Sequence, residues 1–130
     1  LALGLFLGSV AHDNSTRLVL IAPAVEATAA VDTFFQMLEL DDEVRTAFDE
    51  YEYRLFGRPF SWFSLRRALH TIKAPVLWLQ DEDDDITPLA AMLPVKEDGH
   101  PNVQFIVTKG LGHRKIYRDE GVMRQVVGFL

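Results

Sequence analysis

The sequence predicts an α/β protein with a parallel sheet and flanking helices, and three observations lead to this prediction. Short apolar runs at 17–22, 75–80 and 103–108 have the length and the continuous apolar character of strands buried on both faces. Segments with helical patterns separate these runs, so that strand and helix alternate along the chain. Two of the runs end in clusters of polar residues, which indicates a functional edge at the carboxyl ends of the strands.

The first 12 residues are apolar at nearly every position, which is typical of a helix that packs on a sheet beneath other elements. This apolar run lacks the starting methionine and the basic segment of a signal peptide. It is also too short to span a bilayer, which takes about 20 apolar residues. We therefore expect a buried helix over 1–12, followed by a polar turn and by the first strand, which ends at Pro23.

The segment 26–70 is predicted to be helical and to lie between the first two strands. Thr28 is expected to cap a helix that runs to about Leu40, and Asp41 is expected to open a second helix. The second helix carries an apolar stripe at helical spacing, formed by Val44, Phe48, Tyr51 and Leu55. A short helix over 65–70 then returns the chain to the sheet.

The C-terminal part alternates strand and helix twice more. Pro88 suits the first turn of a short helix, and Pro94 is expected to end that helix at about Leu93. After the last strand, Asp119 is expected to cap a final amphipathic helix that extends to Leu130.

The composition is that of one folded domain and excludes several classes of function. In the 130 residues, 48% are hydrophobic and 25% are charged, which is enough apolar material for a core. The net charge of −6 argues against nucleic acid and against anionic membrane surfaces as partners. The absence of cysteine excludes disulfides, a thiolate nucleophile and cysteine-ligated zinc. It also fits a reducing compartment, and we expect a cytoplasmic protein.

Two polar clusters follow neighbouring strands. The strand at 75–80 ends in the acidic run 81–85, and the strand at 103–108 is followed by Gly-Leu-Gly-His at 110–113. A carboxylate and an imidazole at adjacent strand ends are two of the three members of a nucleophilic triad. The other histidines, His12, His70 and His100, fall in turns or at helix ends and suggest no role.

This arrangement resembles the C-terminal part of the α/β-hydrolase family, after the nucleophile elbow. The segment 108–119 is similar to an uncharacterised bacterial subgroup of that family. The resemblance implies that Asp84 is the catalytic acid and His113 the catalytic base. Four aspartates in five residues leave Asp83 and Asp85 as alternatives for the acid. Most of the remaining acidic residues are expected to form a solvated turn.

The same resemblance implies a division of the single domain. Residues 1–25 and 71–130 would form the core of a partial α/β-hydrolase fold, and residues 26–70 would form a helical cap insertion. The cap segment is rich in aromatic residues, which suggests an apolar pocket wall. We predict that Phe60 and Trp62 contact the substrate.

The family's nucleophile motif, Gly-x-Ser-x-Gly, does not occur in the chain. The nearest pentapeptide, Gly-Leu-Phe-Leu-Gly at 4–8, has Phe6 in the place of the nucleophile. We therefore expect the nucleophile to lie before Leu1, and we expect these residues to be an inactive fragment of a longer enzyme. A sheet cut in this way would expose the edge at 17–22, which could join two copies in a homo-oligomer.

The sequence thus predicts a serine hydrolase, esterase-like in its full-length form, that acts on an ester, thioester or related acyl bond of a small molecule. No cofactor or metal is implied. The alternative is a non-catalytic hydrolase-like binding module. It is favoured by the missing elbow, and by Gln80 and Asp81, which stand where the family usually carries histidine and glycine.

A metal site in the acidic run is a third class of hypothesis. The spacing of Asp81, Asp83 and Asp85 copies the opening of a calcium loop, but Ile86 and Met92 stand where that loop needs glycine and glutamate. A magnesium-dependent phosphoryl-transfer site stays open, although the chain has no phosphate-binding glycine loop and this site would not explain the histidine at 113.

Overall fold

The computed structural model describes residues 1–130 and contains a three-stranded parallel sheet in the order β1-β2-β3. The strands are β1 (Leu18–Ile21), β2 (Val76–Asp81) and β3 (Val103–Thr108). Every residue of the central strand β2 is buried, as expected of a parallel strand covered on both faces. The predicted α/β class is confirmed, and β1 lies at one edge of this sheet.

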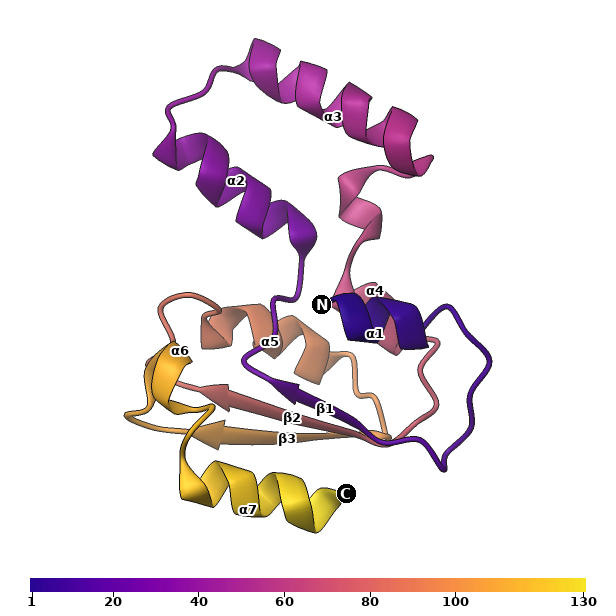
Figure 1. Cartoon of the computed structure of the whole chain (residues 1–130), viewed down its shortest axis with the longest axis vertical. Coiled ribbons are helices and arrows are strands. Elements are labelled where there is room, and N and C mark those ends of the chain that lie inside the picture. The colour runs from indigo at the N-terminus through magenta and orange to yellow at the C-terminus, as the bar shows by residue number, and fades with distance from the viewer.

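Helices cover both faces of the sheet (Figure 1). The helices α1 (Ala2–Leu7), α4 (Leu65–Leu69) and α5 (Leu89–Glu97) lie on one face, and α7 (Glu120–Phe129) lies on the other. The side chains of β2 alternate between two cores. The larger core, under α1, α4 and α5, includes Leu20, Leu69, Trp78, Met92 and Val95. The smaller core, under α7, consists of Ala22, Leu77, Leu79, Ile116 and Val122.

The first helix is shorter and less buried than the sequence predicts. Helix α1 ends at Leu7, and the side chains of Leu3 and Phe6 are 62% and 61% exposed. The helix packs on α4 rather than on the sheet itself, and Gly4 allows the close approach because a methyl group there would collide with Leu65. The predicted helix is present, but the expectations that it extends to residue 12 and is buried on nearly every face are wrong.

The segment between β1 and β2 forms a lobe of helices above the sheet, which we call the helical lobe (residues 27–63). It contains α2 (Ala27–Met37), α3 (Asp42–Phe56) and the 3₁₀ helix η1 (Phe60–Trp62). The helices α2 and α3 lie farther from the sheet than any other helix (Figure 1).

The two ends of the helical lobe are tied together at its base. Glu26 and Ser64 form an isolated antiparallel bridge, and the Ser64 hydroxyl donates to Glu26 Oε1 over 2.7 Å. The N–H of Ala27 donates to the carbonyl of Phe63 over 3.1 Å. This bond satisfies the first amide of α2, so the helix begins at Ala27 without the predicted cap by Thr28.

Helix α3 begins as predicted but does not bury its apolar stripe. Asp41 caps the helix by accepting the N–H of Val44 over 2.9 Å. Within the stripe, Val44, Tyr51 and Leu55 are exposed, and only Phe48 is partly buried. Phe48 packs edge-to-face on Phe35 of α2 and on Phe60 of η1. The one buried residue of α3 is Glu52.

Helix α5 continues past Pro94 to Glu97, so the prediction that proline ends it is wrong. Proline removes one helical hydrogen bond, but Met92 and Val95 on either side of it are buried in the core and hold the turn in place. Helix α7 begins as predicted, with the carboxylate of Asp119 accepting the N–H of Val122 over 2.9 Å. No helix combines the length and the apolar character needed to cross a membrane.

Candidate functional site

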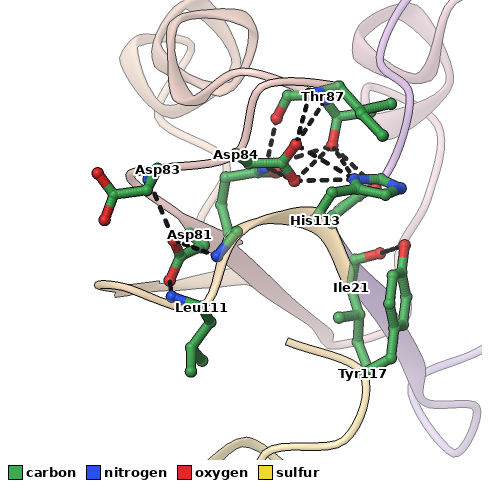
Figure 2. A network of polar contacts seen from close by, with 12 residues as sticks. Ile21, Asp81, Asp83, Asp84, Thr87, Leu111, His113 and Tyr117 are labelled. Carbon is green, nitrogen blue, oxygen red and sulfur yellow. Dashed lines mark hydrogen bonds and ion pairs between the residues drawn. The ribbon is translucent and has the colours of Figure 1, made fainter. Parts of the chain in front are cut away.

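Two loops meet where β2 and β3 end, because the strands are parallel neighbours with Asp81 opposite Thr108. The loop after β2 carries Asp84, and the loop after β3 carries His113. The Nδ1 atom of His113 lies 2.9 Å from Asp84 Oδ2 and 3.2 Å from Asp84 Oδ1 (Figure 2). The structure therefore brings together the acid and the histidine that the sequence singles out.

The two alternatives for the acid do not contact His113. The carboxylate of Asp83 accepts the N–H of Gly110 over 2.8 Å, and Asp85 is exposed. Asp84, in contrast, has a fully buried side chain.

The Asp84 carboxylate is held by several donors. Its Oδ1 atom accepts the N–H groups of Ile86 and Thr87, over 2.9 and 2.7 Å, and the Thr87 hydroxyl lies 2.9 Å from Oδ2 (Figure 2). Burial by itself raises the pKa of Asp84, but the hydrogen bonds from the Thr87 N–H, His113 and the Ile86 N–H outweigh it. The net effect lowers the pKa, so the carboxylate is charged at neutral pH.

Gln80 also belongs to this hydrogen-bond network. Its Nε2 atom donates to Asp84 Oδ2 over 3.2 Å and to the carbonyl of Thr87 over 2.5 Å. Its Oε1 atom accepts the indole N–H of Trp78 over 3.3 Å. The side chain is buried, and its contacts with Asp84 and Thr87 join the end of β2 to the loop that carries the acid.

The ring of His113 is held from a second side by Tyr117. The two rings pack edge-to-face with centroids 5.6 Å apart, and the Tyr117 hydroxyl donates to the carbonyl of Ile21 over 3.2 Å (Figure 2). With Nδ1 donating to Asp84, the free electron pair of the neutral imidazole lies on Nε2. The His113 side chain is 22% exposed, so this nitrogen belongs to a partly accessible group.

Asp81 departs from the prediction of a solvated turn, because it is completely buried. Its Oδ1 atom accepts the N–H groups of Asp83 and Gly112, over 3.0 and 2.8 Å. Its Oδ2 atom accepts the Thr108 hydroxyl over 2.7 Å and the Leu111 N–H over 3.2 Å. Burial by itself raises the pKa of Asp81, but these four donors outweigh it and lower the pKa.

The glycines of the histidine loop make these contacts possible. Gly110 and Gly112 have φ angles of +78° and +60°, in the left-handed region that favours glycine. In this conformation the N–H of Gly110 faces Asp83 and the N–H of Gly112 faces Asp81. The one-turn helix α6 (Gly112–Lys115) then presents His113 to Asp84.

No protein-family model matches this sequence, and no curated protein matches it either. Among solved structures, the Pyrococcus furiosus esterase Pf2001 superposes on it in two crystal forms, each with a TM-score of 0.54 and 18% sequence identity. The chain shares its α/β fold with part of this esterase. The match covers 94% of this chain and 45% of the esterase chain, so the protein described here spans less than half of the esterase's length. At this level of identity, the likeness concerns the fold alone.

The four serines stand away from the Asp84–His113 pair. Ser15 precedes β1 and bonds to Asp13, and Ser9 follows α1 and bonds to the carbonyl of Phe6. Ser64 closes the base of the helical lobe, and its neighbour Ser61 lies within η1. None of them forms a hydrogen bond with the histidine at 113.

The two residues predicted to contact the substrate, Phe60 and Trp62, have different surroundings in the structure. Phe60 lines an open pocket of about 450 Å³ between the helical lobe and the start of the chain. The pocket is almost entirely apolar, and its walls include Leu1, Val31, Phe34, Phe35, Leu40, Val44 and Phe48. Trp62 lies outside this lining. The guanidinium group of Arg67 stacks 3.7 Å from the centroid of its indole ring, and that of Arg58 lies 5.3 Å away.

The acidic run 81–85 uses its buried carboxylates in hydrogen bonds within the protein. Each oxygen of Asp81 and each oxygen of Asp84 accepts at least two donors. These acceptor positions are the ones that a magnesium ion would need. The donor arrangement therefore gives the phosphoryl-transfer alternative no support.

Proposed function

We propose that the protein is a serine-type α/β-hydrolase that acts on an ester, thioester or related acyl bond of a small molecule. Asp84 serves as the acid of its triad and His113 as the base. The observation that carries the proposal is the 2.9 Å contact between Asp84 Oδ2 and His113 Nδ1 at the carboxyl edge of the sheet. The fold shared with an esterase supports the reaction class.

The mechanism follows from this contact. Nε2 of His113 accepts the hydroxyl proton of the serine as its oxygen attacks the acyl carbonyl. The imidazolium then gives this proton to the departing alcohol or thiol, and in the second half-reaction the ring activates a water molecule. Asp84 stays ionised throughout, holds the ring in the required tautomer and stabilises its charged form.

On this proposal, the serine and the oxyanion-hole donors come from residues outside the 130 described here. The chain contains no Gly-x-Ser-x-Gly, and its four serines lie elsewhere in the fold. A segment before Leu1 would place a nucleophile near the start of α1, and Leu1 itself borders the apolar pocket. That pocket, with Phe60 in its wall, would then receive the acyl group, and the 130-residue chain alone would be inactive.

The experiment is to treat the full-length gene product with a serine-directed fluorophosphonate and to measure its intact mass. We expect one covalent adduct, on a serine upstream of Leu1, and a loss of that adduct in His113→Ala. The matched control is His12→Gln, because His12 lies before β1, at the opposite edge of the sheet. This variant is expected to keep full labelling.

The second candidate, a non-catalytic binding module, is favoured by Gln80. The Gln80 amide donates a hydrogen bond to the Asp84 carboxylate. The hydrogen-bond network around Asp84 can therefore serve to stabilise the fold, with no catalytic role. A folded full-length protein that takes up no fluorophosphonate would favour the binding module and would overturn the hydrolase proposal.

A further inference from the structure

Three side chains of the types that ligate metals converge at the edge of the sheet opposite Asp84 and His113. His70 follows α4, Asp98 follows α5, and His100 lies in the loop that leads into β3. His70 lies between α4 and β2, and Asp98 and His100 lie between α5 and β3. All three residues therefore lie at the amino edge of the parallel sheet. One ligand atom from each lies within 4.8 Å of the others.

We propose that His70, Asp98 and His100 form a binding site for a divalent transition-metal ion, with Zn²⁺ as the expected occupant. Asp98 Oδ2 is the common point of the cluster. It lies 4.0 Å from His70 Nε2 and 3.9 Å from His100 Nε2.

The first support comes from an unsatisfied nitrogen. The side chain of His100 is only 8% exposed, and its Nε2 atom is buried without a hydrogen-bond partner. Buried polar atoms without a partner are uncommon in folded proteins and call for an explanation such as a bound ion. This nitrogen faces Asp98, and its ring packs edge-to-face on the ring of His70, with centroids 4.7 Å apart.

The second support is the geometry of the donors. A tetrahedral zinc ion with bonds of about 2.0–2.1 Å separates its ligand atoms by roughly 3.3 Å. The two distances to Asp98 exceed this value by less than about 1 Å. The side chain of His70 is 61% exposed, so it can rotate to close the gap. Water can supply a fourth ligand from the same open side.

The donor set favours zinc over the harder cations. Two imidazole nitrogens and one carboxylate oxygen suit zinc, copper, nickel or cobalt, whereas magnesium and calcium require mainly oxygen ligands. The site also has a structural consequence, because an ion here would join the end of α4 to the end of α5 and to the start of β3. Binding would therefore stabilise the return of the chain from the helical lobe to the sheet.

Arg66 sets the strength of the site. Its guanidinium group donates to Asp98 Oδ2 and Oδ1, both over 2.7 Å, and so fixes the plane of the carboxylate. The same positive charge opposes a divalent cation on Oδ2. Arg66→Gln removes the charge while a side-chain amide can still donate to the carboxylate. We expect this variant to bind zinc more tightly than the unmodified protein.

The test is calorimetric titration of the full-length, chelator-treated protein with Zn²⁺ alone and with Mg²⁺ alone, together with thermal unfolding. We expect one equivalent of zinc to bind, a rise in the unfolding temperature, and no response to magnesium. Both His70→Asn and His100→Gln should weaken zinc binding by more than about tenfold. His12→Gln should leave it unchanged, because both ring nitrogens of His12 already contact backbone groups.

Because the side chain of His70 is exposed, His70→Asn is expected to fold. The test therefore stays decisive even where His100→Gln fails to fold. Absence of zinc binding would overturn the proposal, as would zinc binding that His70→Asn leaves unchanged. Zinc binding that disappears in His113→Ala instead would assign the ion to the other edge of the sheet and would also overturn it. None of these readouts depends on hydrolase activity.

Discussion

Asp81 Oδ1 accepts the N–H of Gly112 over 2.8 Å, and this bond joins the loop that carries the acid to the loop that carries the histidine. The other Asp81 oxygen holds Leu111 and Thr108 in the same way. The distance between Asp84 and His113 therefore depends on a second carboxylate, that of Asp81, which forms a hydrogen bond with neither side chain. Asp81 acts as a positioning residue for the pair.

Asp81→Asn tests this positioning role. An amide in place of the carboxylate turns an N–H group toward backbone N–H donors and leaves at least one of them without an acceptor. We expect a loss of about 1–3 kcal/mol in the free energy of unfolding, measured by urea titration. In the full-length enzyme, kcat should fall while KM stays nearly constant, because the substrate contacts are unchanged.

Glu82→Gln is the matched control for this prediction. The adjacent carboxylate is exposed and pairs with the side chain of Lys109 over 2.7 Å, and such surface pairs contribute little to stability. The positioning role would be contradicted by equal losses in the two variants, or by an Asp81→Asn enzyme with normal kcat.

A pH dependence follows from Asp81 and Asp84 together. Both have a lower pKa in the folded protein than the ordinary value of 3.8, because hydrogen-bond donors outweigh the effect of burial. Their contribution to stability is therefore complete above the ordinary value and is lost as the pH falls through the lower, folded values.

We expect the free energy of unfolding to fall steeply below about pH 4, measured by urea titration at a series of pH values. In Asp81→Asn, the slope in this acidic range should be smaller, because one of the two carboxylates is no longer present to take up a proton. An unchanged slope would show that Asp81 does not titrate as described.

Asp84→Asn tests the acid itself. An asparagine amide can donate to Nδ1 of His113, which would place the ring proton on Nε2 and remove the base that the serine needs. We expect kcat of the full-length enzyme to fall by roughly 10³–10⁴-fold, with little change in KM. The measurement is steady-state hydrolysis of a simple ester, with circular dichroism to verify folding.

The control for this prediction is the exposed neighbour Asp85. Asp85→Asn should retain nearly all of the activity, because this carboxylate makes no contact with the histidine. An equal loss in both variants would reopen the choice of acid that four aspartates in five residues leave unresolved in the sequence.

The pairing of a carboxylate from the run 81–85 with His113 could be predicted from topology, whereas the choice of Asp84 within the run comes from the family resemblance. The two residues follow adjacent parallel strands, and the carboxyl ends of such strands meet at one edge. The burial of Asp81 could not be predicted in the same way. Within an acidic run, the side chain that turns inward is decided by the loop packed against it, and sequence pattern carries no information about that loop.

The apolar stripe of α3 shows the same limit for packing. The spacing of Phe48 and Tyr51 correctly predicts a helix, since both lie on one face at helical intervals. Periodicity does not tell which elements cover that face. Here Phe48 packs on Phe35 of α2 and on Phe60 of η1 and is partly buried, whereas Tyr51 is exposed. The proximity of His70 and His100 could likewise not be predicted from the sequence, because the two residues are 30 positions apart and meet only in the fold.

Glu52 is the buried residue of α3, and its Oε2 atom has no hydrogen-bond partner. Burial raises the pKa of its carboxyl group, the nearby Asp49 raises it further, and Arg45 opposes both. The charged form is thus less favourable in the folded protein than in the unfolded chain. The contribution of Glu52 to stability therefore falls as the pH rises above its ordinary value of 4.5.

We expect Glu52→Gln to increase the free energy of unfolding at neutral pH by about 1 kcal/mol, since it removes a buried charge without changing the shape of the side chain. Below about pH 4 the variant and the parent protein should be equally stable, because the glutamate is then protonated in both states. Urea titration at the two pH values measures the difference. Glu50→Gln, at an exposed position of the same helix, should change neither value. A gain that persists in acid would have to come from packing rather than from charge.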